Sequence, residues 1–127
     1  MQICNNIGTN EKGNLTFAGF DTVDLAKKYG TPLYLMDEDK IREKMRAYKT
    51  AMKKHFGDGA MPIYASKAAS FKQMYRIAKS EGIGVDVVSG GEIYTALSAE
   101  FDISNAFFHG NNKTPEEISF AIENGIG

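Results

Sequence analysis

The chain has 127 residues, of which 43% are hydrophobic and 24% charged, a composition typical of one globular domain. Its 15 lysines and arginines nearly balance 16 acidic residues, so it has no net field of the kind that recruits nucleic acid or an anionic membrane. A single cysteine, Cys4, excludes an internal disulfide, and the sequence has no cysteine and histidine pattern for a metal.

The polar residues 1–13 do not resemble a signal peptide, and no apolar run approaches the ~18 residues of a membrane span. We therefore expect a soluble, cytoplasmic protein. Residues 14–20 alternate apolar with small or polar side chains, which predicts a strand. Asp21 is the expected N-cap of a helix over residues 22–29, because Gly30 and Pro32 stop the helix.

Strands and helices are predicted to alternate from residue 33 onward. The starts of the predicted strands are 30, 22 and 21 residues apart, a spacing typical of βα units with parallel strands. A (β/α)₈ barrel of the TIM type needs roughly 250 residues, so we expect about its first four βα units. A small open α/β sheet that is complete in itself is the alternative. The predicted strands are 33–36, 63–66, 85–88 and 106–108, and the predicted helices begin after Asp37, after Ser70, at Glu92 and, as a capping box, after Thr114.

Lys67 is the most informative single residue, because it lies near the end of the apolar run 61–68. A lysine in a buried strand is costly unless it is used, since burial disfavours the charged ammonium and leaves a nucleophilic amine. Such an amine suits covalent attachment of a carbonyl cofactor, pyridoxal 5'-phosphate above all. From its position alone, the same lysine is also consistent with a side chain that extends its charge into water.

Two further candidates belong to the next two predicted strands: Asp86 lies within residues 85–88, and His109 closes residues 106–108. Asp86 lies among valines and needs a partner, although a carboxylate that accepts loop N–H groups is equally consistent with this position. His109 precedes Gly110 and several hydrogen-bond donors, although an isolated histidine there is more often structural. In a parallel barrel, residues at strand ends gather at one rim. The glycines of residues 89–91 suit an anion-binding nest, but an ordinary turn explains them better.

Four segments carry a resemblance to a known family: residues 29–34 (YGTPLY), 64–68 (YASKA), 86–94 (DVVSGGEIY) and 108–113 (FHGNNK). They resemble, in the same order, segments of the alanine-racemase-like fold of pyridoxal phosphate enzymes and, more narrowly, of the diaminopimelate decarboxylases. The resemblance implies a pyridoxal phosphate-binding barrel with Lys67 as the catalytic residue. It also implies a cofactor pocket formed by Lys67, Ala65, Asp86 and His109, in which Asp86 orients the lysine.

The same resemblance implies a domain arrangement and a reaction. Residues 1–20 would contribute a strand to a second β domain and residues 21–127 the amino-terminal half of the barrel, with the remainder absent and the complete enzyme a homodimer. The expected reaction converts meso-diaminopimelate, a small amino-acid substrate, to L-lysine, whereas the chain alone is expected to be inactive. In the commoner form of the family motif an asparagine follows the Lys-Ala pair, whereas this chain has Ala69 there. The alternatives are a decarboxylase of ornithine, arginine or carboxynorspermidine, a non-catalytic pyridoxal phosphate-binding module, or a partner-binding segment without a cofactor.

Overall fold

The structure is a computed structural model that describes residues 4–127. The chain divides after Ile41 into two compact units. Among the described residues, no helix has the length and apolar character needed to cross a membrane.

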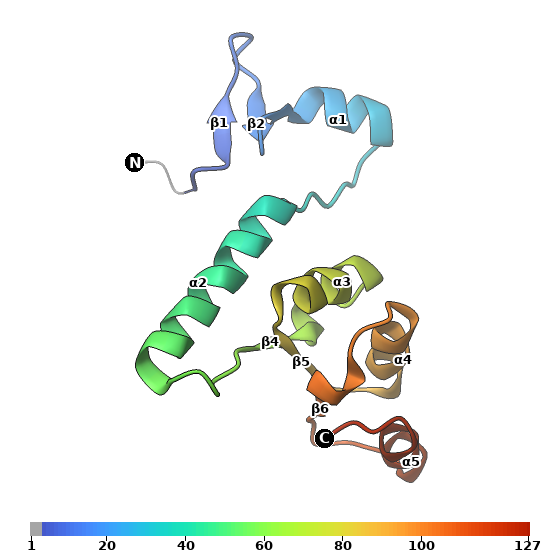
Figure 1. Cartoon of the computed structure of the whole chain (residues 1–127). Helices are drawn as coiled ribbons and strands as arrows, with labels where there is room; N and C mark the ends of the chain where they lie inside the picture. Colours follow the sequence, from blue (N-terminus) through green and yellow to red (C-terminus); the bar gives the residue numbers. More distant parts are fainter. Residues whose placement is uncertain (1–3) are drawn as a thin grey trace. The chain divides into compact units, whose positions relative to one another are not determined.

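The first unit contains a three-stranded antiparallel sheet followed by a helix (Figure 1). The single strand predicted over residues 14–20 is wrong, because the chain reverses within it. Ala18 and Gly19 have φ angles of 50° and 83°, and positive φ at both central positions is the requirement of a tight two-residue hairpin turn. The elements are β1 (Ile7–Thr9), β2 (Leu15–Phe17), β3 (Phe20–Asp21) and α1 (Thr22–Tyr29).

Helix α1 confirms its predicted bounds and its cap. The carboxylate of Asp21 accepts the N–H groups of Val23 and Asp24, and Gly30 follows with a φ of 82°. By contrast, the strand predicted over residues 33–36 is wrong. A strand needs a neighbour for its N–H and C=O groups, and no strand of residues 4–127 pairs with this segment.

Helix α2 (Glu38–Phe56) begins after Asp37, whose carboxylate accepts the N–H of Lys40 at 3.1 Å, as predicted. The apolar side chains of α2 are only partly buried. Met45 is 8% exposed, whereas Tyr48 is 68% exposed.

The second unit contains a parallel sheet in the order β4, β5, β6 (Figure 1). The α/β class with parallel strands is thereby confirmed, whereas three strands do not close a barrel. The strands are β4 (Ile63–Ala65), β5 (Gly84–Val87) and β6 (Ala106–Phe108); the helices are α3 (Lys72–Glu81), α4 (Gly90–Ser98) and α5 (Pro115–Glu123), with short 3₁₀ helices η1 (Ser66–Ala68) and η2 (Ile103–Asn105).

The predicted helix starts are partly correct. Thr114 forms the expected capping box with Glu117. Ser70 is not a cap, because its hydroxyl pairs with the Tyr75 hydroxyl at 2.9 Å instead. Helix α4 begins two residues earlier than predicted, where the Ser89 hydroxyl accepts the N–H of Glu92 at 3.3 Å.

The core of the second unit lies against one face of the sheet. Val85 and Val87 are fully buried there with side chains from α3 and α4, among them Tyr75, Ile77 and Ile93. Successive side chains of a strand point to opposite faces, so Asp86 projects from the other face. Ala65 and Phe107 are its register partners on the neighbouring strands.

Candidate active site

The predicted site residues lie at the carboxyl-terminal edge of the parallel sheet. Lys67 lies in η1 directly after β4, Asp86 lies in β5, and His109 follows β6. Because the three strands are parallel, their carboxyl ends meet at one edge.

Lys67 is exposed, and the prediction that it lies in a buried strand is wrong. The ladder ends at Ala65, after which the Ala69 N–H donates to the Ser66 carbonyl at 3.0 Å and closes a 3₁₀ turn. The turn takes the chain out of the sheet before Lys67. No residue between 4 and 127 forms a hydrogen bond or ion pair with its ammonium group, which leaves the amine accessible to a ligand.

Asp86 and His109 approach each other. His109 Nδ1 lies 3.8 Å from Asp86 Oδ2, close enough for an ion pair when the imidazole is protonated. The His109 N–H donates to the Val87 carbonyl at 3.0 Å, which holds the histidine at the end of the sheet. The Asp86 side chain is 23% exposed, but its Oδ1 atom is buried and has no hydrogen-bond partner in the described chain. A buried carboxylate oxygen without a donor is costly, so this atom is open to a donor from a ligand or another side chain.

Ser66 and Glu92 support this edge, and neither was predicted as a site residue. Ser66 is completely buried, and its hydroxyl lies 2.7 Å from the Asp86 carbonyl oxygen and 2.8 Å from Glu92 Oε2. The N–H of Val88 donates to the same Glu92 oxygen at 2.7 Å. Both residues lie within the quoted motifs, but their contact joins positions 26 apart in the sequence and depends on the pairing of β4 with β5.

The N–H of Gly90, the first residue of α4, is not open to an anion. The Gly90 N–H donates to Glu117 Oε1 at 2.8 Å, and the Thr114 N–H donates to the other oxygen at 3.1 Å. These two bonds, that of Gly90 first, lower the pKa of Glu117. A carboxylate of the chain itself thus occupies the Gly90 donor. Neither the anion nest nor the ordinary turn describes this segment fully, because both glycines belong to the first turn of α4.

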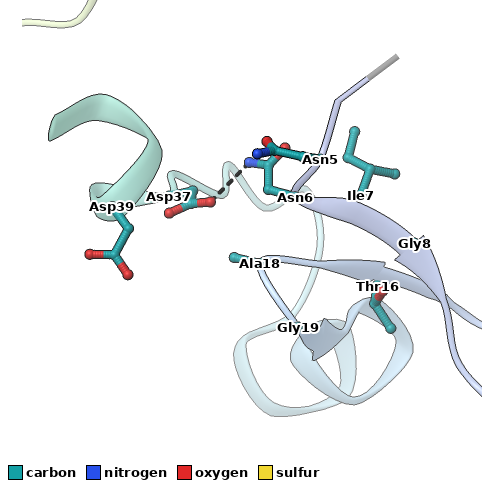
Figure 2. A pocket seen from close by; sticks show the side chains of 9 residues that line it. All are labelled: Asn5, Asn6, Ile7, Gly8, Thr16, Ala18, Gly19, Asp37 and Asp39. Atoms are coloured by element: carbon teal, nitrogen blue, oxygen red, sulfur yellow. Dashed lines mark hydrogen bonds between the residues drawn. The ribbon is translucent and has the colours of Figure 1, made fainter. Parts of the chain in front are cut away.

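The first unit contains a separate recess (Figure 2). On one side, Asn6 Nδ2 donates to Asp37 Oδ2 at 2.9 Å, the contact that Figure 2 marks with a dashed line. None of the predicted site residues lines it. Across residues 4–127, no cluster of three or more histidine, cysteine or acidic side chains is arranged to hold a metal. The lining residues are Asn5, Asn6, Ile7, Gly8, Thr16, Ala18, Gly19, Asp37 and Asp39.

Comparison with known proteins identifies the family. The sequence profile described as "Pyridoxal-dependent decarboxylase, pyridoxal binding domain" matches residues 38–127. The chain belongs to this family. Two diaminopimelate decarboxylases, from Bacillus methanolicus and Bacillus subtilis, are 50% and 48% identical to it over 118 residues. The match covers 93% of this chain and 27% of each relative, so the chain spans about a quarter of their length.

Solved structures agree with this assignment. A diaminopimelate decarboxylase from M. jannaschii, in complex with L-lysine, superposes with a TM-score of 0.82 at 34% identity. The likeness covers 96% of this chain and 29% of that one. The Helicobacter pylori diaminopimelate decarboxylase, also with L-lysine, gives a TM-score of 0.73 at 34% identity, over 84% of this chain and 26% of that one.

The edge of the sheet fits the cofactor of the pyridoxal-dependent decarboxylases. Pyridoxal phosphate carries an aldehyde that reacts with an amine, and the Lys67 amine is exposed and without a partner within the described range. The orphaned Asp86 Oδ1 offers a carboxylate oxygen to a donor. Because the Gly90 N–H is occupied by Glu117, it is not among the groups available to the phosphate.

Proposed function

We propose that this chain is the amino-terminal part of the pyridoxal phosphate-binding barrel of a diaminopimelate decarboxylase, in which Lys67 binds the cofactor covalently. The observation that carries the proposal is the exposed Lys67 amine, which has no partner among residues 4–127, on the sheet edge that also holds the unsatisfied Asp86 oxygen. The diaminopimelate decarboxylases that match at up to 50% identity support the choice of substrate.

Each residue of the site has a distinct part in this proposal. Lys67 supplies the amine that holds the cofactor, and Asp86 accepts a hydrogen bond from that amine once substrate has released it. Ala65 and His109 border the cofactor; the imidazole also limits the exposure of the Asp86 carboxylate. When bound, the cofactor takes up the electrons left on the substrate α-carbon as carbon dioxide departs. The overall conversion is meso-diaminopimelate to L-lysine and carbon dioxide.

The proposal extends to the rest of the enzyme. Residues 1–20 would contribute to a second β domain, residues 21–127 to the barrel, and the complete cytoplasmic enzyme would be a homodimer. Two exposed apolar side chains in the first unit, Leu15 at 54% and Phe20 at 65%, support a further layer over this sheet. The match covers only 27% of the length of the matched relative, which supports the proposal that the complete enzyme contains further parts.

Borohydride reduction tests the assignment of Lys67. The complete decarboxylase that contains this chain is incubated with pyridoxal phosphate, reduced, digested and mapped by mass spectrometry, and we expect the cofactor on Lys67. Lys113 is the matched control, because its ammonium group donates to the Phe108 carbonyl and lies over the Phe108 ring. A label on Lys113 in place of Lys67, or no label at all, contradicts the proposal.

A further inference from the structure

We infer that Ser66 is a positioning residue for Lys67, because its buried hydroxyl ties the turn that carries the lysine to β5 and α4. The inference rests on the proposed function, since the position of Lys67 has a chemical consequence only if this residue binds the cofactor.

The Ser66 hydroxyl is a junction between three segments. Ser66 Oγ lies 2.7 Å from the carbonyl oxygen of Asp86, in the backbone of β5. Ser66 Oγ also lies 2.8 Å from Oε2 of Glu92, in the first turn of α4. The same Glu92 oxygen accepts the Val88 N–H at 2.7 Å, so one carboxylate connects the serine with the residue that follows β5. The hydroxyl has one proton and therefore donates to one of these two acceptors at a time, while its oxygen remains within hydrogen-bond distance of both.

Two other contacts hold the segment around the lysine: Ala65 pairs with Asp86 in the strand ladder, and the Tyr64 hydroxyl donates to the Ala69 carbonyl at 3.3 Å. Helix η1 has three residues and a single closing bond, from the Ala69 N–H to the Ser66 carbonyl at 3.0 Å. Hydrogen bonds of 3₁₀ helices have poor geometry and hold short segments only. Ser66 is the buried residue of this turn, whereas Lys67 and Ala68 are exposed. The hydroxyl of Ser66 therefore determines where the Lys67 backbone lies relative to Asp86.

Hydrogen exchange of the 127-residue chain tests the anchor without cofactor. The Ala69 amide reports on the turn and the Val88 amide on the Glu92 carboxylate. Ser66→Ala removes the hydroxyl and almost no volume. Both amides are expected to exchange roughly two- to tenfold faster, the effect of losing one hydrogen bond. The Ile118 amide in α5 provides an internal reference.

Cofactor labelling tests the positioning itself. After incubation with pyridoxal phosphate and borohydride reduction, we measure the ratio of label on Lys67 to label on Lys113. Ser66→Ala should lower this ratio roughly tenfold or more, since misplacing a reacting group by about 1 Å can cost on the order of 10²-fold. Global unfolding would also lower this ratio, because it frees Lys113 from the Phe108 carbonyl. The ratio is therefore compared only under conditions in which the Ile118 amide exchanges at the same rate in both chains.

Two further variants sharpen the test. Ser104 is the matched control: it lies in the 3₁₀ helix η2, and its hydroxyl donates to the Asp102 carboxylate at 2.7 Å. Ser104→Ala should change neither the amide exchange rates nor the labelling ratio. Glu92→Gln retains an oxygen that accepts from Ser66 and Val88, so its labelling ratio should stay within about threefold of the unsubstituted chain.

The combined results of hydrogen exchange and cofactor labelling test the role of Ser66. Unchanged exchange at Ala69 and Val88 with an unchanged labelling ratio in Ser66→Ala overturns the inference. Faster exchange with an unchanged ratio also overturns it, because Ser66 is then merely structural. No label on Lys67 in the unsubstituted chain refutes the proposed function, and the positioning role with it. A lower ratio in Ser66→Ala on a chain that labels normally supports both.

Discussion

Asp86 shows how strand geometry changes the meaning of a sequence pattern. The valines on both sides of this acid suggest that it is buried in apolar surroundings. In the structure Val85 and Val87 point into the core, whereas Asp86 points to the opposite face. The acid is therefore not enclosed by the valines, and its buried oxygen, which has no donor within residues 4–127, is available to another group.

Substitution of Asp86 by asparagine should lower turnover while the fold survives. The change preserves shape but removes the charge that we expect to balance the released Lys67 ammonium. In the decarboxylase that contains this chain, kcat should fall by roughly 10²-fold or more, as when a positioned acid or base is lost. Release of L-lysine from meso-diaminopimelate is the measurement. Asp58→Asn, at an 85% exposed side chain, is the control. A kcat within about twofold of the unsubstituted enzyme, or an unfolded variant, would return Asp86 to a structural role.

The site residues differ in how far the sequence reveals them. Lys67 and His109 are predictable because each lies at the end of an apolar run, and Asp86 because it interrupts one. Parallel strands bring these positions toward one edge of the sheet. The exposure of Lys67 is not predictable in this way, because the turn at η1 is closed by a backbone hydrogen bond that almost any residues can make. The contact of Ser66 with Glu92 depends on strand register, which no local pattern encodes.

At the scale of elements, one carboxylate joins two helices. Glu81, at the end of α3, accepts two hydrogen bonds from Arg46 at 2.7 Å each and one from Arg42 at 2.8 Å. Both arginines belong to α2. These bonds, with Arg46 contributing most, lower the pKa of Glu81 from 4.5 to about 2. Two-point binding by a guanidinium group is geometrically specific, so this pair fixes how the two helices meet within the second unit.

The stability of the chain should therefore depend on pH through Glu81. Its pKa is lower in the folded than in the unfolded chain, so the unfolded chain binds more protons between pH 4.5 and about 2. The contribution of Glu81 is complete above pH 4.5 and is lost as the pH falls toward 2. Urea unfolding across this range should show a smaller decline for Glu81→Gln than for the unsubstituted chain. Glu123→Gln, at an exposed position, should not differ from it. Parallel curves for Glu81→Gln and the unsubstituted chain would contradict this prediction.

The capping box of α5 gives a second prediction at this scale. The Thr114 hydroxyl accepts the Glu117 N–H at 3.2 Å, and the Glu117 carboxylate accepts the Thr114 N–H at 3.1 Å. Thr114→Ala removes the cap and should destabilise the fold by about 1 kcal/mol. Thr114→Ser retains the hydroxyl and should be nearly neutral. Thermal unfolding followed by circular dichroism compares the two, and equal melting temperatures would show that the cap contributes nothing.

Helices proved more predictable than strands for a physical reason. A helix satisfies its backbone internally, so caps such as Asp21 and Thr114 announce it locally. A strand exists only with a partner, and residues 33–36 have an apolar sequence but no partner strand in the described part of the chain. The hairpin turn at Ala18 and Gly19 is difficult to predict from the sequence, since alanine rarely adopts the positive φ that the turn requires.

At the scale of the whole molecule, the parallel sheet of the second unit has an open edge and exposed apolar side chains. Strand β4 pairs only with β5 among residues 4–127, which leaves one edge of β4 open. Ile63 and Phe107, on the face that carries Asp86, are 46% and 39% exposed. Open edges and exposed apolar side chains promote association between copies of a chain.

We predict that the 127-residue chain alone self-associates, and that it releases no measurable L-lysine from meso-diaminopimelate. Light scattering after size-exclusion chromatography should give a mean mass that rises with protein concentration. A lysine on an edge strand opposes such pairing, so Ile63→Lys should shift the distribution toward the monomer. Tyr94→Lys is the matched control, because Tyr94 is 66% exposed but lies on α4, away from the sheet edge, and it should leave the distribution unchanged. A chain that stays monomeric at every concentration, or one that produces L-lysine by itself, would show that this sheet needs no further strands to be stable and active.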